Sequence, residues 1–244
     1  MRGCAGDIFM WRRWVADIHL WLSLIVGLQV LAWVVSGLFM SVPSIERVRS
    51  EHLMAAPVVA DLSSEGPFVA PQTVLAAAGA PVRRIGVERV GGRSVYVVEP
   101  YEGRNMLFDA ASGARLSPID ESFARAIAEQ AIAGDEPAQR MTLIEQNPPI
   151  EYRGELPVWR ADFGGSDNLS VFVTADTGRV AARRSDLWRV YDFLWSLHIM
   201  DYRERENFNH PLLIAFSVGA LAMSLFGIIL LFIRLPSRLR PKRA

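Results

Sequence analysis

Two long apolar stretches stand near the ends of the chain, and a middle part with mixed apolar and polar positions separates them. Within residues 14–42 the only charged residue is Asp17, and residues 211–233 carry no charge. Each stretch is longer than the roughly 20 residues that a helix needs to cross a bilayer. The pattern therefore predicts two transmembrane helices, over residues 14–42 and 210–233.

The middle part, residues 43–186, shows a helical pattern followed by strand patterns, twice over. An alanine-rich stretch at residues 71–80 and an amphipathic stretch at 121–133 predict the two helices. Runs of alternating or β-branched residues predict the strands. These runs are 82–90, 94–100 and a segment ending at 109 in the first unit, and 141–146, 157–163 and 169–174 in the second.

Each unit ends in a similar turn, FDAASGARLS in the first and VTADTGRVAA in the second. Gly113 and Gly178 stand at the turn position that needs a positive φ. We therefore expect an α+β domain of two helix-plus-antiparallel-sheet repeats, at about residues 68–118 and 119–184. In each repeat the helix should cover one face of its sheet.

An amphipathic, aromatic stretch connects this domain to the second apolar stretch. Trp188, Tyr191, Phe193 and Trp195 are residues of the kind that gather at the level of lipid headgroups. The pattern predicts that residues 187–209 lie on the outer membrane–water interface.

Basic residues at both ends of the chain predict its topology. Residues 1–13 carry three of them and residues 234–244 carry five, so both ends should be cytoplasmic and the middle extracytoplasmic. Residues 18–233 carry 18 basic and 24 acidic residues, a balance that excludes a nucleic-acid-binding surface. The single cysteine, Cys4, falls on the cytoplasmic side and allows no intramolecular disulfide.

The four histidines lie only in or beside the apolar stretches, at His19, His52, His198 and His210. Because residues 53–197 contain none, a Ser/His/Asp triad in the middle domain is excluded. The chain also lacks a Walker loop, a dinucleotide-binding glycine fingerprint, CxxC and HExxH. Ionisable residues in membrane segments are usually functional, and neutral imidazole is a standard axial ligand of haem iron. The histidines therefore predict a membrane haem or metal carrier.

The predicted topology puts the histidines in two layers. His19 lies near the cytoplasmic face, and His52, His198 and His210 lie near the outer face. A haem b in each layer, with two histidine ligands, would give electrons a path across the membrane. The inner layer offers only His19, so it needs a second copy or a partner membrane subunit. The alternative for His19 is a hydrogen bond to a neighbouring helix.

Two arginines in the outer layer are candidates for binding haem propionates. Arg203 and Arg205 lie between His198 and His210 in the sequence. Guanidinium groups form strong, charge-assisted hydrogen bonds to carboxylates. The alternative is that both are exposed charges in the polar sequence DYRERE.

The order of these segments resembles that of the PepSY-associated transmembrane proteins of bacteria. The resemblance rests on DIHLWLSLIVGL around His19, on the two module-ending turns, and on LWSLHIMDY around His198. It implies a PepSY-like extracytoplasmic domain held at the bacterial cytoplasmic (inner) membrane. Longer members have four membrane helices, and some resemble ferric-siderophore reductases that carry haem, whereas this chain has two predicted helices.

The resemblance implies a haem-b electron carrier that serves iron acquisition and receives electrons from a cytoplasmic flavoprotein reductase. Two other functions remain open. The chain could be a non-enzymatic, membrane-anchored PepSY binding module that regulates a protease or assists a partner. It could also be an accessory subunit of a larger membrane complex.

Overall fold

A computed structural model describes residues 4–56 and 61–238 of the chain, except for the side chains of residues 4–19, 22, 63, 226, 227 and 229–238. The chain forms two compact units. Met1–Pro43 and Tyr191–Ala244 make a helical unit, and Ser44–Val190 makes an α+β unit.

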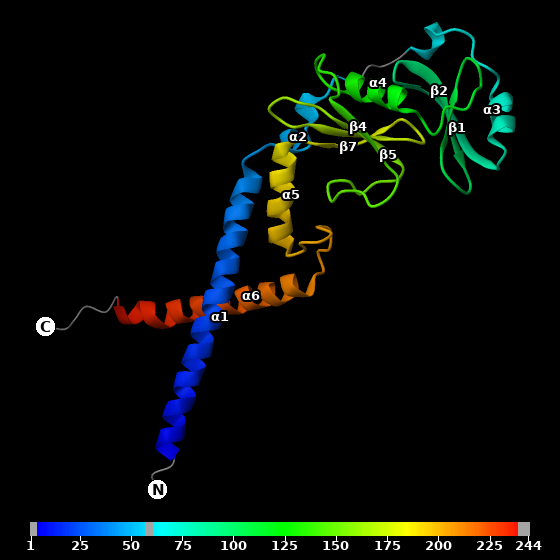
Figure 1. Ribbon diagram of the computed structural model, residues 1–244. Helices are drawn as coiled ribbons and strands as arrows, with labels where there is room; N and C mark the ends of the chain where they lie inside the picture. Colours follow the sequence, from blue (N-terminus) through cyan, green and yellow to red (C-terminus); the bar gives the residue numbers. More distant parts are fainter. Residues whose placement is uncertain (1–3, 57–60, 239–244) are drawn as a thin grey trace. The chain divides into compact units, whose positions relative to one another are not determined.

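The first sheet of the α+β unit has three antiparallel strands in the order β1-β2-β3 (Figure 1). The strands are β1 (Val82–Val90), β2 (Arg93–Pro100) and β3 (Met106–Asp109), and the preceding helix is α3 (Pro71–Ala78). Because side chains alternate between the faces of a strand, Tyr96 and Val98 of β2 pack with Val74 of α3. Val95 and Val97 of β2 belong to a second, larger core.

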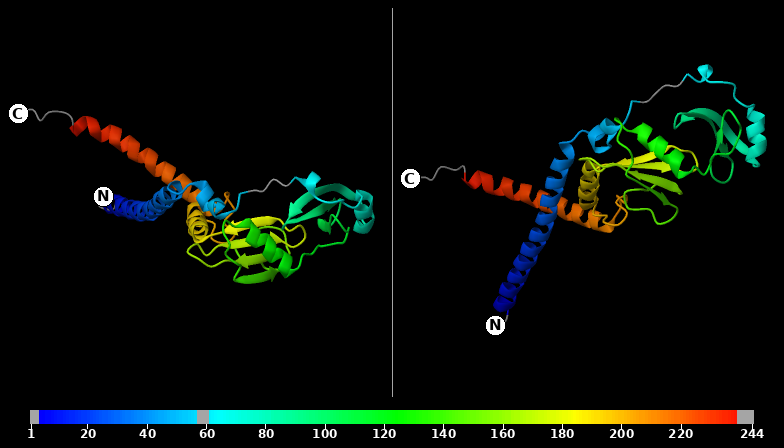
Figure 2. Two further views of the ribbon diagram at one scale, coloured as in Figure 1. Left: turned by 90° about the horizontal axis from the view of Figure 1, so that it is seen from above. Right: turned by 45° about the horizontal axis from the view of Figure 1, so that its top comes forward.

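The second sheet has four antiparallel strands in the order β4-β5-β6-β7. The strands are β4 (Arg140–Ile144), β5 (Val158–Asp162), β6 (Ser170–Thr174) and β7 (Val180–Arg184). Helix α4 (Glu121–Ala131) lies along this sheet, as Figure 2 shows in two further views. Asp120 caps α4 because its carboxylate accepts the N–H of Phe123 at 2.8 Å. The α+β class and the two antiparallel sheets are thus confirmed.

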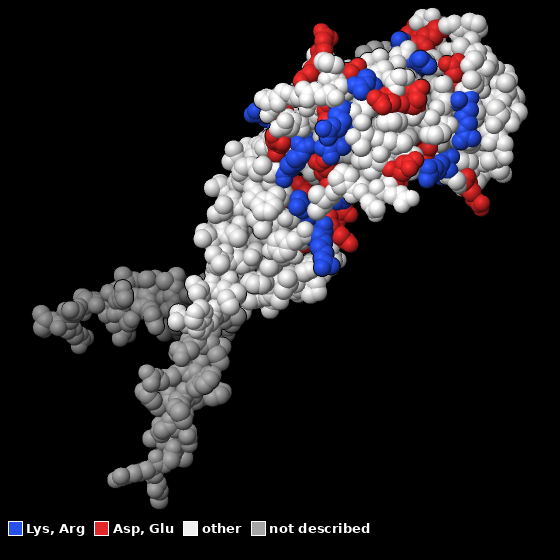
Figure 3. Space-filling view, in the orientation of Figure 1, with Lys and Arg blue, Asp and Glu red and all other residues white. Residues whose placement is uncertain are grey.

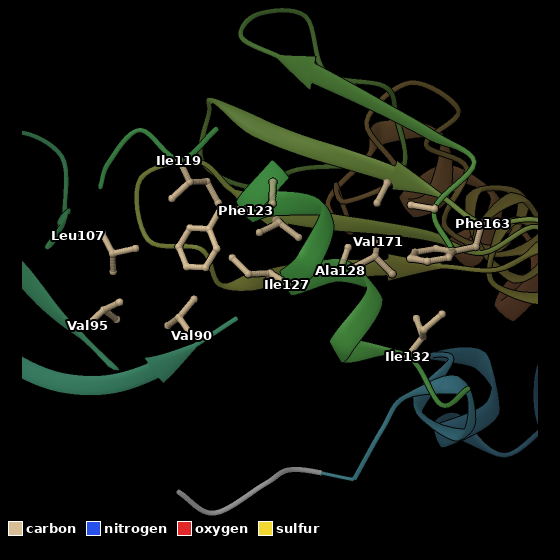
Figure 4. Close-up of a cluster of buried hydrophobic side chains, with 14 of the residues drawn as sticks. Val90, Val95, Leu107, Ile119, Phe123, Ile127, Ala128, Ile132, Phe163 and Val171 are labelled. Carbon is tan, nitrogen blue, oxygen red and sulfur yellow. The ribbon is translucent and has the colours of Figure 1, made fainter. Parts of the chain in front are cut away.

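The main core of the α+β unit gathers around α4 (Figure 4). Phe123, Ile127 and Ala128 of this helix contact apolar residues from both sheets. Val95, Val97 and Leu107 come from the first sheet, and Ala161, Val171 and Val173 from the second. Since α3 covers the other face of the first sheet, its central strand β2 is buried on both faces.

Three short helices complete the α+β unit: α2 (Ile45–Val48), η1 (Glu51–Leu53) and η2 (Leu62–Ser64). Helix α5 (Asp186–Ile199) begins in this unit and continues into the helical unit. Arg189 ties the first turn of α5 to the second sheet. Its guanidinium donates to Glu151 at 3.0 Å, to Ser170 at 2.9 Å and to the Asn168 carbonyl at 2.7 Å.

The helical unit contains α1 (Cys4–Ser41), the later part of α5, and α6 (Pro211–Arg238). Helices α1 and α6 meet at Gly219, where an added Cβ would lie 3.5 Å from Val26. Among the described residues, Ser23–Ser41 is long and apolar enough to cross a membrane, while the apolar segment Pro211–Leu225 is shorter. The crossing of the membrane by α6 stays a prediction.

The helical unit exposes its apolar side chains, and its buried side chains include polar ones. Nine large apolar residues of α1 are more than half exposed: Leu20, Trp21, Leu24, Ile25, Leu28, Leu31, Val34, Val35 and Leu38. Ser36 of the same helix and Asp192 of α5 are buried. The described surface of α1 shows no charged side chains, whereas charged side chains are spread over the α+β unit (Figure 3). Such a distribution suits helices that face lipid rather than water.

Candidate functional site

His198 lies in the last turn of α5, where this helix packs on α1. The indole N–H of Trp33 donates a 2.9 Å hydrogen bond to the backbone carbonyl of His198. Carbonyl groups in the last turn of a helix have no partner within the helix. Trp33 therefore satisfies an otherwise free carbonyl and fixes the backbone that carries the imidazole.

The imidazole ring of His198 contacts a small-residue step on α1. Its Nδ1 lies 3.1 Å from the hydroxyl of Ser36, which is 1% exposed. A Cβ on the adjacent Gly37 would lie 3.8 Å from the ring, so the ring fits closely against this helix. The rings of Trp195 and His198 are nearly parallel, at 7° with centroids 6.4 Å apart. Among the described residues, no hydrogen bond to Nε2 of His198 is found.

A buried ion pair lies on the same helix as His198. Asp192, 5% exposed, binds Nη1 of Arg205 at 2.5 Å. Arg205 is also buried at Nε, an atom that has no hydrogen-bond partner among the described residues. The residue predicted to bind a propionate is therefore engaged by a carboxylate of its own chain.

The loop after α5 is organised by Asp201. Its carboxylate accepts four backbone N–H groups at 3.1–3.2 Å, from Arg203, Glu204, Glu206 and Asn207. The bond from Asn207, together with the other three, lowers the pKa of Asp201 to about 2. This anionic group fixes the path of the loop that leads into α6.

The other predicted site residues have different surroundings. His210 is the N-cap of α6, where its Nδ1 accepts the N–H of Leu212 at 3.4 Å. Arg203 is exposed on the loop, and its backbone N–H donates to the Asp201 carboxylate. His52 is exposed in the α+β unit, within η1. The backbone of His19 belongs to α1, but its side chain lies outside the described part of the chain.

Four residues of this region were not predicted from the sequence: Trp33, Ser36, Asp192 and Asp201. Asp192 could have been recognised in the sequence as a residue in need of a partner, because it is the only acid between Asp186 and Asp201 in an otherwise aromatic segment. An isolated acid of this kind must find a partner if it is buried. Trp33 and Ser36 carried no such signal, since each is an ordinary residue of a membrane helix.

Metal-ligating side chains do not cluster elsewhere in the described part of the chain. No group of three or more His, Cys, Asp or Glu residues is arranged to hold a metal ion there. The His198 region thus offers a single imidazole. A single imidazole would be enough for one protein ligand of haem iron, because the porphyrin supplies the four other nitrogen ligands.

The apolar helices and the two-sheet domain define a membrane protein with an α+β domain. The family described as the PepSY-associated TM region matches residues 16–243, and the chain belongs to this family. The resemblance found in the sequence is therefore confirmed. No curated protein and no solved structure matches the chain.

Proposed function

We propose that this protein is a haem-b electron carrier of the bacterial cytoplasmic membrane. It passes electrons from a cytoplasmic reductase to an acceptor on the outer side, such as a ferric siderophore or another ferric chelate. The observation that carries this proposal is the environment of His198, an imidazole held through Nδ1 beside aromatic rings with Nε2 unengaged by any described residue.

His198 would hold the outer haem and His19 the inner one. A bound haem b supplies reversible one-electron transfer between ferric and ferrous iron. Helix α1 sets the spacing of the two layers, because it carries His19 and also Ser36, the contact of His198. These two positions are 17 residues apart, which corresponds to a rise of about 26 Å along the helix. That distance is close to the roughly 30 Å thickness of a bilayer core.

The remaining ligands have to come from other residues or other chains. His210 is the second candidate in the outer layer, with His52 behind it, and Arg203 is the exposed arginine that could bind a propionate. The inner layer has only His19 from each chain, so a homo-oligomer or a partner membrane subunit completes it. The basic residues at both ends favour cytoplasmic termini and an extracytoplasmic α+β unit. The electron donor would then be a cytoplasmic flavoprotein reductase, as the family resemblance implies.

Single histidine variants test this arrangement. His198→Ala and His19→Ala should each remove one of two haem signals and roughly half of the bound haem. Leu143→Ala is the control, because Leu143 is exposed in the α+β unit and is not a candidate ligand. The two-layer arrangement is wrong if both haem signals persist in His19→Ala or in His198→Ala.

A second candidate function is a membrane-anchored binding module without haem. It is favoured by a polar hollow of about 550 Å³ on the second sheet, lined by residues that include Arg160, Asp162 and Arg189. If the protein binds no haem, this hollow is the first place to test for a ligand or a partner protein. Substitution of Arg140, which also lines the hollow, should then weaken that binding.

A further inference from the structure

The hydrogen bonds around Ser36 constrain the protonation of His198. The Ser36 hydroxyl contacts two groups, the Trp33 carbonyl at 3.2 Å and Nδ1 of His198 at 3.1 Å. A hydroxyl has one proton to donate, and a carbonyl oxygen can only accept. When the proton points to the Trp33 carbonyl, the bond to His198 requires that Nδ1 be the donor.

We propose that Ser36 is a positioning residue that holds neutral His198 in its Nδ1–H tautomer, which makes Nε2 the atom that binds a ligand. A neutral imidazole has one N–H and one lone pair, so a proton on Nδ1 leaves the lone pair on Nε2. Metal-binding histidines commonly donate their other ring N–H in this manner, which fixes the tautomer and the ring orientation. Haem as the ligand rests on the proposed function, but the tautomer does not.

The neighbours of His198 support this assignment. Trp33 holds the His198 backbone through its indole N–H, and Gly37 leaves room for the ring against α1. The acid that lies closest along α5 is Asp192, and its carboxylate binds Arg205. Ser36 is therefore the polar side chain that sets the ring proton of His198 within the described part of the site.

His210 provides an internal contrast. Its Nδ1 accepts the N–H of Leu212, so a neutral His210 carries its proton on Nε2. Binding iron through Nε2 would require His210 to change tautomer and to give up this cap. Of these two histidines, His198 is therefore the one prepared to ligate through Nε2.

The tautomer can be measured without haem. Nitrogen-15 NMR of histidine-labelled, haem-free protein in lipid nanodiscs distinguishes the two ring nitrogens, and His198→Gln identifies the signal of His198. Wild-type protein should show Nδ1 protonated. Ser36→Ala should shift His198 toward the Nε2–H tautomer, and Ser36→Thr, which keeps the hydroxyl, should restore the wild-type state.

Ser41→Ala is the matched control. Ser41 lies on the same helix and bonds the carbonyl three residues before it, as Ser36 does, but it is exposed. This variant should leave His198 unchanged. An Nε2–H tautomer in the wild-type protein, or an unchanged tautomer in Ser36→Ala, would overturn the proposal.

Titration with hemin tests the consequence for ligand binding. Ser36→Ala should bind hemin at the His198 site about 10- to 100-fold more weakly than the wild type, whereas Ser36→Thr and Ser41→Ala should not differ from it. Equal affinities of Ser36→Ala and wild-type protein would overturn the positioning role. If the wild type binds no hemin while its tautomer is Nδ1–H, the proposed function fails and the tautomer assignment stands.

Discussion

At the scale of single residues, the Asp192–Arg205 pair is a buried ion pair of the helical unit. Asp192 is 5% exposed and the Arg205 side chain 18%, so both charges are largely removed from water. A buried pair contributes little net stability over apolar residues of similar size, but removal of one partner leaves an uncompensated charge. The pair therefore fixes how the loop and α5 meet.

Asp192→Asn should lower the free energy of unfolding by about 3–5 kcal/mol, because it leaves the Arg205 guanidinium buried without a counter-charge. Thermal unfolding in a mild detergent, followed by tryptophan fluorescence, measures the change. The double variant Asp192→Leu/Arg205→Met should recover most of the loss, and Arg203→Ala should have little effect. A single-variant loss below about 1 kcal/mol would contradict the burial of the pair.

Asp201 makes the loop sensitive to acid. Its folded-state pKa of about 2 lies below the ordinary value of 3.8, so its ionisation stabilises the folded loop above pH 3.8. That contribution is lost as the pH falls from about 4 through 2. Protection of the loop from an acid-active protease should decrease over this window in the wild type. Asp201→Ala should be cleaved more readily than the wild type at about pH 4, where Asp201 is still ionised, and should show a flatter pH profile. Identical profiles would exclude the four-amide arrangement.

The sequence identified His198 but not the residues that hold it. Histidines are few and chemically distinctive, so their placement beside apolar stretches could be noticed directly. Ser36 and Trp33 are 162 and 165 residues away from His198 in the chain, and only the packing of α5 on α1 brings them together. The prediction for Arg205 overlooked Asp192, which lies on the preceding helix.

At the scale of elements, the two repeat-ending turns both depend on a glycine. Both predicted glycines have positive φ, +73° at Gly113 and +65° at Gly178. They differ in their surroundings. A Cβ at Gly178 would lie 2.7 Å from Val90 and 3.0 Å from Ile127, whereas one at Gly113 would come no closer than 3.4 Å to Val69.

Gly178→Ala should therefore destabilise the protein more than Gly113→Ala. Both substitutions force a left-handed backbone on a residue with a side chain, at about 1–2 kcal/mol. Gly178→Ala adds the cost of overpacking the core around α4, about 1–3 kcal/mol. The midpoint of thermal unfolding of the α+β unit measures both. Equal losses would show that the turn of Gly178 does not pack on Val90 and Ile127.

Helices α1, α3, α4 and α6 and six of the seven strands were predicted from the sequence. Helix α1 begins at Cys4 rather than at residue 14, and the short helices α2, η1 and η2 were not predicted. The run of β-branched and aromatic residues in β2 and the amphipathic pattern of α4 are local signals that tertiary packing did not overrule. Strand β7 was missed because VAARR has neither alternation nor a run of β-branched residues. It becomes a strand through pairing with β6, for example Phe172 with Ala182.

At the scale of the whole molecule, the two units distribute their side chains in opposite ways. The α+β unit buries valine, leucine and phenylalanine, as a domain in water does. The helical unit exposes such residues along α1 and encloses Ser36, Asp192 and Ser196. This contrast agrees with a membrane protein that carries an extramembranous domain, and the apolar pattern of the sequence was sufficient to predict it.

Cysteine labelling tests the predicted topology. Cys4 is the single native cysteine, so Cys4→Ser gives a clean background for Thr142→Cys, an exposed position on β4. In spheroplasts, a membrane-impermeant maleimide should label the Cys4→Ser/Thr142→Cys variant at once. It should reach Cys4 of the wild-type protein only after permeabilisation. The opposite pattern would invert the topology and assign the α+β unit to the cytoplasm.

An absorption spectrum of the purified protein, oxidised and then reduced with dithionite, with haem quantified per chain, tests whether the protein carries haem b. We expect sharp α and Soret bands of low-spin haem b in the reduced protein, and weaker bands in His198→Ala. A colourless protein from haem-sufficient cells would contradict the electron-carrier function.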